Sequence, residues 1–334
     1  MYPQFSYFQH STMRFRTEID LLPTEFSIDH NRIGFMAGSC FSQHIADRLS
    51  QAKFNVTVNP SGILFNPESI ASLIDRLARK SHYSAEDLFF SDGLWHCYDT
   101  HGVFSSDSAR QTLEKINDSL TQGAETLFNA DYVILTFGTA WVYRLAATGS
   151  VVANCHKQPA HLFRREQLSA EHIVRLFSPL LEGPLADKQV LFTVSPVRHL
   201  KDGLSDNFLS KSILRCAIDS LQKSYDNTYY FPAFEILNDD LRDYRFYAED
   251  MLHPSPQAID YVWEKFTAFA MNDHTRSLLP KLAKLSAAMQ HRILHNQDSH
   301  VETFRQSSLR LVEELKKSLP DVNFEHETKY FSAL

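Results

Sequence analysis

The chain has 334 residues, of which 43% are apolar and 22% charged, and its net charge is −7. This composition is that of a globular protein and excludes wholesale disorder. The acidic balance, without clustered Lys and Arg, argues against a nucleic-acid partner, and no run of about 18 apolar residues predicts a membrane segment. The four cysteines are scattered, with no C-x-x-C pair, which favours a reducing compartment. We therefore expect a cytoplasmic protein that acts on a small molecule.

After a poorly patterned segment at 1–12, short apolar runs alternate with amphipathic stretches. This rhythm predicts an α/β fold with a mainly parallel sheet of five strands. The strands are expected at 32–37, 55–58, 132–137, 189–194 and 229–234. Helices are expected after residue 40 and at 67–80, 108–127, 166–180, 209–223 and 256–271. Two hairpins, at 95–104 and 141–155, interrupt the alternation, the second turning at Gly149.

From about residue 274 the chain is rich in Lys, Leu, Ala and Glu at helical spacing. This pattern predicts a helical C-terminal extension over 274–334, following a main domain over 13–273. Its apolar stripe can pack on the chain's own main domain, or it can join two copies into a homo-oligomer.

The stretch IGFMAGSCFSQHI, which begins at Ile33, combines an apolar strand, a glycine and a helix start. A strand that ends at Gly38 and passes directly into a helix puts Ser39 and Cys40 at the carboxyl edge of the sheet. The helix N-terminus can lower a cysteine pKa and stabilise an anion, so either side chain is a candidate nucleophile. The structural alternative is that Ser39 caps the helix and Cys40 is a small buried residue.

The second motif is Asp250-Met251-Leu252-His253, in a loop before the helix expected at 256. A carboxylate three residues before an imidazole can orient it and leave its other nitrogen free to act as a base. The structural alternative is a helix-capping loop with an exposed histidine. A zinc site made by Asp250, His253 and His199 has suitable residue types but lacks a recognisable ligand spacing, so we expect no metal and no cofactor.

With these two motifs the chain resembles the GSCFA family, within the SGNH (GDSL-type) hydrolase superfamily. Further matching segments cover roughly residues 13–270, in the expected order: NPSGILFNP, LTFGTAWVY, NCHKQP, TVSPVRHLKDG and LRDYRFYAEDMLHPS. The resemblance implies a flavodoxin-like three-layer α/β/α sandwich. For the wider superfamily it implies ester hydrolysis or acyl transfer.

The resemblance also implies roles for single residues. The nucleophile falls on Cys40, or on Ser39 if the turn shifts by one residue, with His253 as the base. The glycine that supplies an oxyanion N–H falls on Gly62, for which a plain turn glycine is the alternative. The superfamily's third block is normally Gly-x-Asn, but here it is Gly138-Thr139-Ala140. The asparagine is therefore missing, and the Thr139 hydroxyl is the candidate substitute.

Arg198 and His199 follow the strand expected at 189–194, where they can bind a substrate carboxylate or phosphate or pair with acidic neighbours. The leading hypothesis is a hydrolase or acyltransferase that acts on an ester of a carbohydrate or small metabolite. A non-catalytic ligand-binding protein that keeps the sandwich is the alternative, favoured by the missing asparagine. Thiol or redox chemistry at Cys40 is a third hypothesis.

Overall fold

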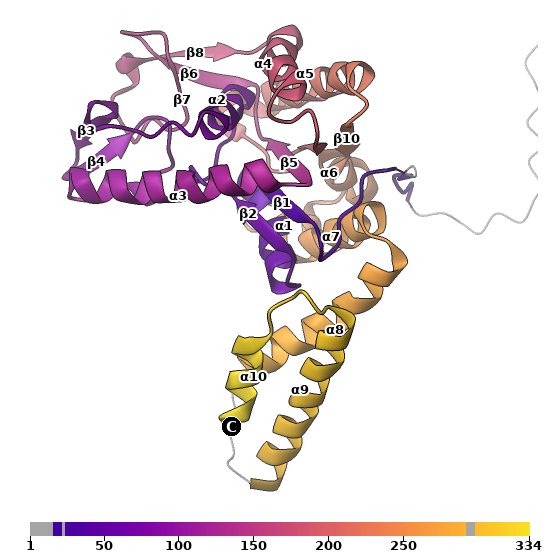
Figure 1. Cartoon of the computed structure of the whole chain (residues 1–334). Coiled ribbons are helices and arrows are strands. Elements are labelled where there is room, and N and C mark those ends of the chain that lie inside the picture. The colour runs from indigo at the N-terminus through magenta and orange to yellow at the C-terminus, as the bar shows by residue number, and fades with distance from the viewer. Residues whose placement is uncertain (1–15, 22–23, 292–297) are drawn as a thin grey trace, which may run out of the picture.

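The computed structural model describes residues 16–21, 24–291 and 298–334 (Figure 1). The segment 1–12 lies outside the described residues. The described chain forms a layered α/β body, from which a group of helices at the C-terminal end projects.

Five parallel strands form the central sheet, in the order β2, β1, β5, β9, β10. They are β1 (Ile33–Gly38), β2 (Asn55–Val58), β5 (Tyr132–Phe137), β9 (Gln189–Val194) and β10 (Thr228–Phe231). Counted along the chain, this is the flavodoxin-like order 2-1-3-4-5. The predicted sheet is confirmed. Its last strand ends earlier than expected because Pro232, which has no N–H to pair, leads into a short helix, α6 (Ala233–Glu235).

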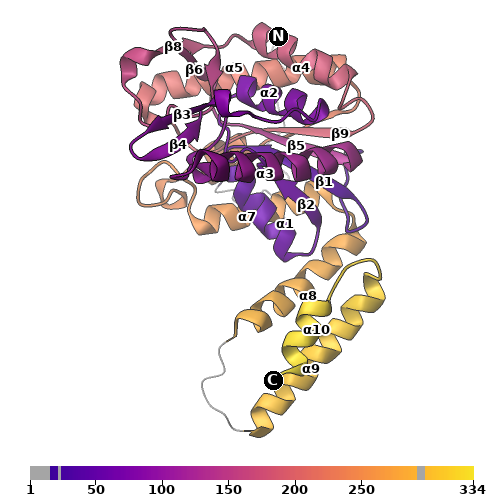
Figure 2. The same cartoon turned by 60° about the vertical axis from the view of Figure 1, so that its left-hand side comes forward.

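Residues of each strand alternate between the two faces of the sheet, and both faces are covered by helices (Figure 2). In β5, Val133 and Leu135 belong to one apolar core, and Ile134 belongs to the other. The first core contains residues of α2 (Pro67–Ala78), α3 (Ala109–Asn129), α4 (Ala170–Glu182) and α5 (Gly203–Ser224). The second contains residues of α1 (Cys40–Gln51) and α7 (Pro256–Ala270). The predicted α/β/α sandwich is therefore confirmed.

Two small antiparallel sheets extend the body. β3 (Leu88–Ser91) pairs with β4 (Leu94–Cys97) through a turn at Asp92 and Gly93, which both have positive φ. The first hairpin thus lies upstream of the expected 95–104. The second, β6 (Trp141–Leu145) with β7 (Val151–Val152), is confirmed.

A third strand, β8 (Phe163–Gln167), pairs with β6 and was not expected. It occupies the beginning of the helix predicted at 166–180. That helix, α4, begins only at Ala170 because the Ser169 hydroxyl accepts a hydrogen bond from the His172 N–H and caps it there. Helix α5 begins at Gly203, upstream of the expected 209. Short helical turns complete the body, at Ala85–Asp87, Gly102–Phe104, Ala160–Leu162, Leu200–Asp202, Ile236–Leu241 and Tyr244–Phe246.

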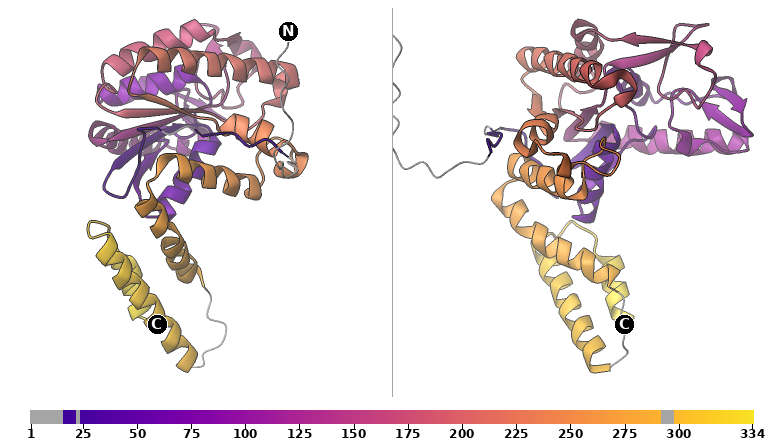
Figure 3. Two further views of the ribbon diagram at one scale, coloured as in Figure 1. Left: turned by 90° about the vertical axis from the view of Figure 1, so that its right-hand side faces the viewer. Right: turned by 180° about the vertical axis from the view of Figure 1, so that it is seen from behind.

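Helices α8 (Asp273–Gln290), α9 (Asp298–Ser318) and α10 (Glu325–Ser332) project from the side of the body that carries α1 and α7 (Figures 1 and 3). Leu282 of α8 and Phe331 of α10 belong to the same apolar core as Ile45 of α1. The predicted helical extension is therefore present and packs on its own chain. Its self-association stays a prediction. No helix in the described ranges is both long enough and apolar enough to span a bilayer.

Candidate active site

The candidate site lies at the carboxyl ends of β1 and β5. The chain leaves β1 for α1 on one face of the sheet and leaves β5 for elements on the other face. In open parallel sheets such a divergence point is where ligands bind, because the loops separate and leave a crevice. The segment after β9 and the turn at Asp250 come to the same edge, since the Arg198 N–H donates to the Leu252 carbonyl at 3.1 Å.

Gly38 makes the tight turn between β1 and α1. Its φ is 145°, and a Cβ there would lie 2.2 Å from the Thr136 carbonyl oxygen. The Gly38 N–H donates to Oδ1 of Asn59 at 2.9 Å, and the Ser39 N–H donates to the Thr136 carbonyl at 3.2 Å. Neighbouring strands on both sides therefore hold the residues that precede Cys40.

Ser39 and Cys40 have different environments. Ser39 is 1% exposed and takes the N-cap position of α1, but its hydroxyl caps no N–H and has no hydrogen-bond partner within the described ranges. Cys40 is the first residue of α1 and is partly exposed. Of the two candidate nucleophiles, Cys40 is thus the one that solvent can reach.

The Cys40 thiol has a pKa above its ordinary value because burial disfavours the thiolate. The N–H groups of Phe41 and Cys40 and the charge of Lys211 lower this pKa, but by less than burial raises it. The sequence predicted a thiolate favoured by the helix terminus. In the structure burial outweighs the terminus, so Cys40 rests as a neutral thiol at pH 7.

Asp250 and His253 form the hydrogen bond that a carboxylate–imidazole pair requires. Asp250 Oδ2 lies 2.6 Å from His253 Nδ1, while Oδ1 accepts the N–H groups of Leu252 and His253 at 2.9 and 3.0 Å. These bonds, led by the His253 N–H, lower the pKa of Asp250 to about 2. The two side chains are 45% and 46% exposed. The imidazole is thus oriented through Nδ1 and has Nε2 on the other side of the ring.

His253 is close enough to His44 of α1 and to His199 after β9 for its charge to lower the pKa of both. His44 is one helical turn after Cys40 and so shares its face of α1. The pKa of His199 falls to about 4, mainly through burial and then through the charges of Lys211 and His253. His199 is therefore neutral at pH 7, with Nε2 buried and lacking a hydrogen-bond partner in the described part of the chain.

The expected oxyanion donors are engaged elsewhere. The Gly62 N–H donates to the Asn59 carbonyl at 2.7 Å, and a Cβ on Gly62 would lie 2.3 Å from that of His101. The Thr139 hydroxyl lies 3.1 Å from Ser210 Oγ and accepts the Trp141 N–H at 3.1 Å. The turn and the close contact with His101 therefore explain why a glycine occupies position 62, without a role as an oxyanion donor.

The first N–H groups of α1 remain as anion donors at this edge. The initial N–H groups of a helix have no partner within it, and they carry its partial positive charge. In α1 they belong to Cys40 and Phe41, beside the candidate nucleophile.

Arg198 stacks on aromatic rings. Its guanidinium carbon lies 3.8 Å from the ring centroid of Tyr247 and 5.4 Å from that of Tyr244. Together with the backbone bond to Leu252, this stacking fastens the Asp250–His253 turn to the end of β9.

Sequence reasoning missed Lys211 and Asn59. Lys211, on α5, is 1% exposed, and its Nζ donates to the carbonyls of Gly138 at 2.6 Å and Ser195 at 2.8 Å. Burial lowers its pKa to about 7, and interaction with Cys40 raises it. The signal for Lys211 was a lysine on the apolar stripe of a predicted helix. Asn59 directly follows a strand and precedes a proline, a place where a polar side chain can fix a turn.

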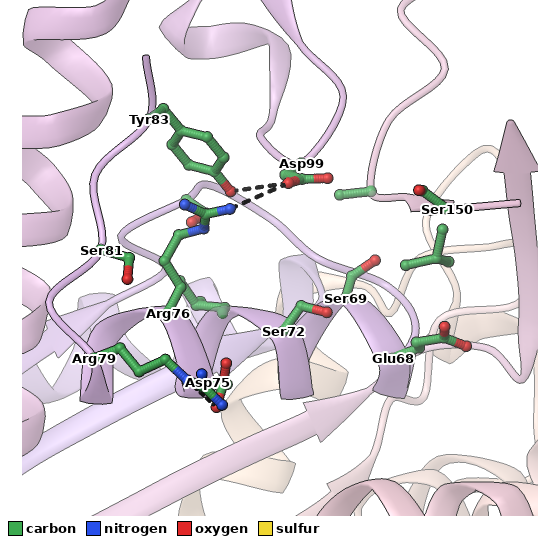
Figure 4. Close-up of a pocket in the computed structure, with 14 residues that line it drawn as sticks. Glu68, Ser69, Ser72, Asp75, Arg76, Arg79, Ser81, Tyr83, Asp99 and Ser150 are labelled. Carbon is green, nitrogen blue, oxygen red and sulfur yellow. Dashed lines mark hydrogen bonds and ion pairs between the residues drawn. The ribbon is translucent and has the colours of Figure 1, made fainter. Parts of the chain in front are cut away.

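A pocket of 470 Å³ lies apart from these residues, along α2 (Figure 4). Most of its ionisable side chains pair with one another: Arg79 with Asp75 at 2.9 Å, and Asp99 with Tyr83 at 3.2 Å and Arg76 at 3.9 Å. None of the candidate catalytic residues lines it. The chemistry of the carboxyl edge therefore does not extend into this pocket.

Within the described ranges, no three His, Cys, Asp or Glu side chains gather as a metal site would require. A family model described as the GSCFA family matches residues 34–266, more than half of the chain. None of the curated proteins compared with the chain matches it. The matched range contains both Cys40 and the Asp250–His253 pair.

Proposed function

Because the chain belongs to the GSCFA family, we propose that it is an SGNH-like hydrolase or acyltransferase that cleaves an ester through Cys40. The observation that carries this proposal is the 2.6 Å hydrogen bond between Asp250 and His253. It fixes the imidazole through Nδ1 and leaves Nε2 to accept a proton, which is what nucleophilic catalysis needs of a general base.

In the proposed reaction Cys40 Sγ attacks the acyl carbon while His253 Nε2 takes the thiol proton. The C–O bond of the ester then breaks, the proton passes from His253 to the leaving alcohol, and a thioester remains on Cys40. Water or a second alcohol, deprotonated by His253, then attacks the thioester. The C–S bond breaks, the acid or a new ester is released, and the proton returns from His253 to Cys40 Sγ. Asp250 stays ionised and stabilises the imidazolium that forms in each half-reaction.

The neutral thiol of Cys40 in the resting protein agrees with this reaction scheme. Since burial raises the pKa of Cys40, its proton has to leave during attack, which makes a general base necessary. Ser39 is the weaker candidate because its hydroxyl is buried. The N–H groups of Cys40 and Phe41 are the proposed donors to the oxyanion.

Exposed apolar side chains on the segments that carry Arg198, His199 and His253 support an acyl group as part of the substrate. Leu200, Leu204 and Phe208, which follow β9, are 45%, 55% and 53% exposed, and Met251 beside His253 is 46% exposed. Exposed apolar groups that gather near a polar site mark a binding surface for an apolar ligand. The alcohol portion, proposed to be a carbohydrate or small metabolite, would face Arg198.

We also propose that the protein acts in the cytoplasm. All four cysteines are free in the structure, which suits a reducing compartment.

A panel of chromogenic p-nitrophenyl esters tests the hydrolase proposal. We expect the wild type to hydrolyse at least one short-chain ester, with Cys40→Ala and His253→Ala reducing kcat/KM by about a hundredfold or more. Cys216→Ala and His82→Ala are matched controls away from the site and should retain wild-type rates. Activity that survives in both Cys40→Ala and His253→Ala would exclude this site. Activity that survives in Cys40→Ala but is lost in Ser39→Ala and His253→Ala would identify Ser39 as the nucleophile.

A non-catalytic ligand-binding protein is the second candidate. The observation that favours it is the engagement of both expected oxyanion donors, the Gly62 N–H and the Thr139 hydroxyl. It predicts that the wild type hydrolyses no ester in the panel, and that an acyl ligand nevertheless raises its melting temperature.

A further inference from the structure

Lys211 is a buried cation placed behind the candidate site. Its Nζ holds the carbonyls that follow β5 and β9, Gly138 at 2.6 Å and Ser195 at 2.8 Å. An ammonium group has three donors, so these two bonds leave one N–H uncommitted. The neighbouring residue, Ser210, accepts the Ala140 N–H at 2.8 Å, so α5 fixes the loop after β5 at two points.

The groups that face Lys211 come from three elements. Cys40 of α1 interacts with it electrostatically, and each raises the population of the other's charged form. His199, after β9, is kept neutral partly by the charge of Lys211. The ring of Phe234 lies 5.9 Å from Nζ. Among the described residues, no carboxylate forms an ion pair with Lys211, so Cys40 is the group that can supply a balancing negative charge.

We infer that Lys211 is a positioning residue that stabilises negative charge on Cys40 Sγ during the reaction, an inference that rests on Cys40 being the proposed nucleophile. When the thiol proton passes to His253, Lys211 keeps its own proton, and a thiolate–ammonium pair forms at the end of α1. Because the Lys211 ammonium is buried, its attraction for the thiolate is stronger than that between two charges in water. The carbonyls of Gly138 and Ser195 hold the ammonium in place, so no side chain has to move as the charge develops.

The rate at which iodoacetamide alkylates Cys40 tests this inference without any ester. The uncharged reagent reacts with the thiolate, and peptide mass spectrometry reports Cys40 separately from the other cysteines. Lys211→Gln removes the charge but keeps two N–H donors for the carbonyls. Lys188→Gln is the matched control, because Lys188 is 5% exposed and its Nζ donates to the carbonyls of Phe128 and Ala130 at the opposite end of the sheet.

We expect Lys211→Gln to lower the rate about tenfold at pH 6, where Lys211 is mostly charged, corresponding to a rise of about one unit in the thiol pKa. Lys188→Gln should match the wild type. An unchanged rate in a folded Lys211→Gln variant would overturn the inference. So would an equal loss in both variants, which would indicate a general structural effect.

If Lys211→Gln fails to fold, the pH dependence of the Cys40 alkylation rate in the wild type tests the inference instead. Because the Lys211 pKa is about 7, deprotonation of the lysine should offset thiol ionisation, and the rate should flatten above pH 7 before it rises again. A rate that rises tenfold per pH unit from pH 6 to 8.5 would overturn the inference. The esterase panel is an independent test. If the protein hydrolysed no ester but its Cys40 reactivity still depended on Lys211, only the hydrolase proposal would be refuted.

Discussion

Asn59 Oδ1 accepts the Gly38 N–H at 2.9 Å, a bond that joins the end of β2 to the turn before Cys40. The same amide donates through Nδ2 to Gln43 of α1 at 3.3 Å, and Asn59 is 7% exposed. One side chain thus ties the strand, the turn and the first helix together. The position of Cys40 depends on it.

Asn59→Ala should lower the free energy of unfolding by about 1–3 kcal/mol, because it leaves the buried Gly38 N–H without an acceptor. Urea unfolding measures this loss. Asn129→Ala is the control, since Asn129 is exposed and its side chain bonds within its own helix, α3, to the Glu125 carbonyl. Equal losses in the two variants would contradict the role of Asn59.

Gly38→Ala should be more costly than the same replacement at Gly149, another glycine with positive φ. A Cβ at Gly38 would meet the Thr136 backbone, whereas one at Gly149, whose φ is 76°, meets nothing within 4 Å. Gly149→Ala should therefore cost only about 1–2 kcal/mol of backbone strain. Gly38→Ala should lose a further 1–3 kcal/mol, roughly, through the overlap. Thermal unfolding of the two variants compares these losses, and similar melting temperatures would count against a rigid turn at Gly38.

Asp250→Asn should reduce kcat/KM for an ester about a hundredfold, since the amide neither stabilises the imidazolium nor fixes its tautomer. Asp243→Asn is the matched control: Asp243 also accepts a nearby backbone N–H, that of Arg245 at 2.9 Å, and is 49% exposed. An equal effect of both substitutions would show that the carboxylate of Asp250 only shapes its loop.

The same carboxylate makes stability depend on pH. Its folded-state pKa, about 2, lies below the ordinary value of about 3.9, so its hydrogen bonds stabilise the fold fully above roughly pH 5. The contribution is lost as pH falls through 4 toward 2. The difference in urea midpoint between wild type and Asp250→Asn should be constant from pH 8 to 5 and shrink in acid. A difference that widens in acid would contradict this assignment.

The sheet was predictable because its three central strands are buried on both faces and because its strands are bounded by turn residues. Buried runs such as 132–137 and 189–194 stand out in the sequence, and the predicted ends match β5 and β9. The first hairpin was misplaced, although Asp92-Gly93, a strong turn signal, marks its true position. β8 was missed because its sequence, FRREQ, carries too little apolar alternation to predict a strand.

The sequence predicted only those residues of the candidate site that belong to local motifs. Ser39, Cys40 and the Asp250–His253 pair follow local rules for strand ends and turns. The direction of the Gly62 N–H depends on how its turn closes, and Lys211 meets Gly138 across 73 positions of the sequence. In an amphipathic helix pattern, a lysine among the apolar positions is read as a break in the apolar stripe and not as a buried cation. Only packing shows that its ammonium ends beside backbone carbonyls.

Phe331→Ala tests whether the C-terminal helices share the core of the sheet. Phe331 is fully buried, 6.0 Å from Phe304 by ring centroids, in the core that also contains Ile45 of α1. The substitution should cost about 3–5 kcal/mol. Phe128→Ala, at a side chain that is 75% exposed, should change stability by no more than about 0.5 kcal/mol.

Because the core is continuous from α1 to α10, the Phe331→Ala variant should still unfold in one transition, at a lower urea midpoint. Far-UV circular dichroism would follow the helices, and tryptophan fluorescence would follow the body, since all three tryptophans lie in it, at positions 95, 141 and 263. Coincident curves from the two probes indicate one cooperative unit. Loss of helix before the change in fluorescence would show instead that α8–α10 unfold as a separate unit, which would support the predicted boundary near residue 274 as a domain boundary.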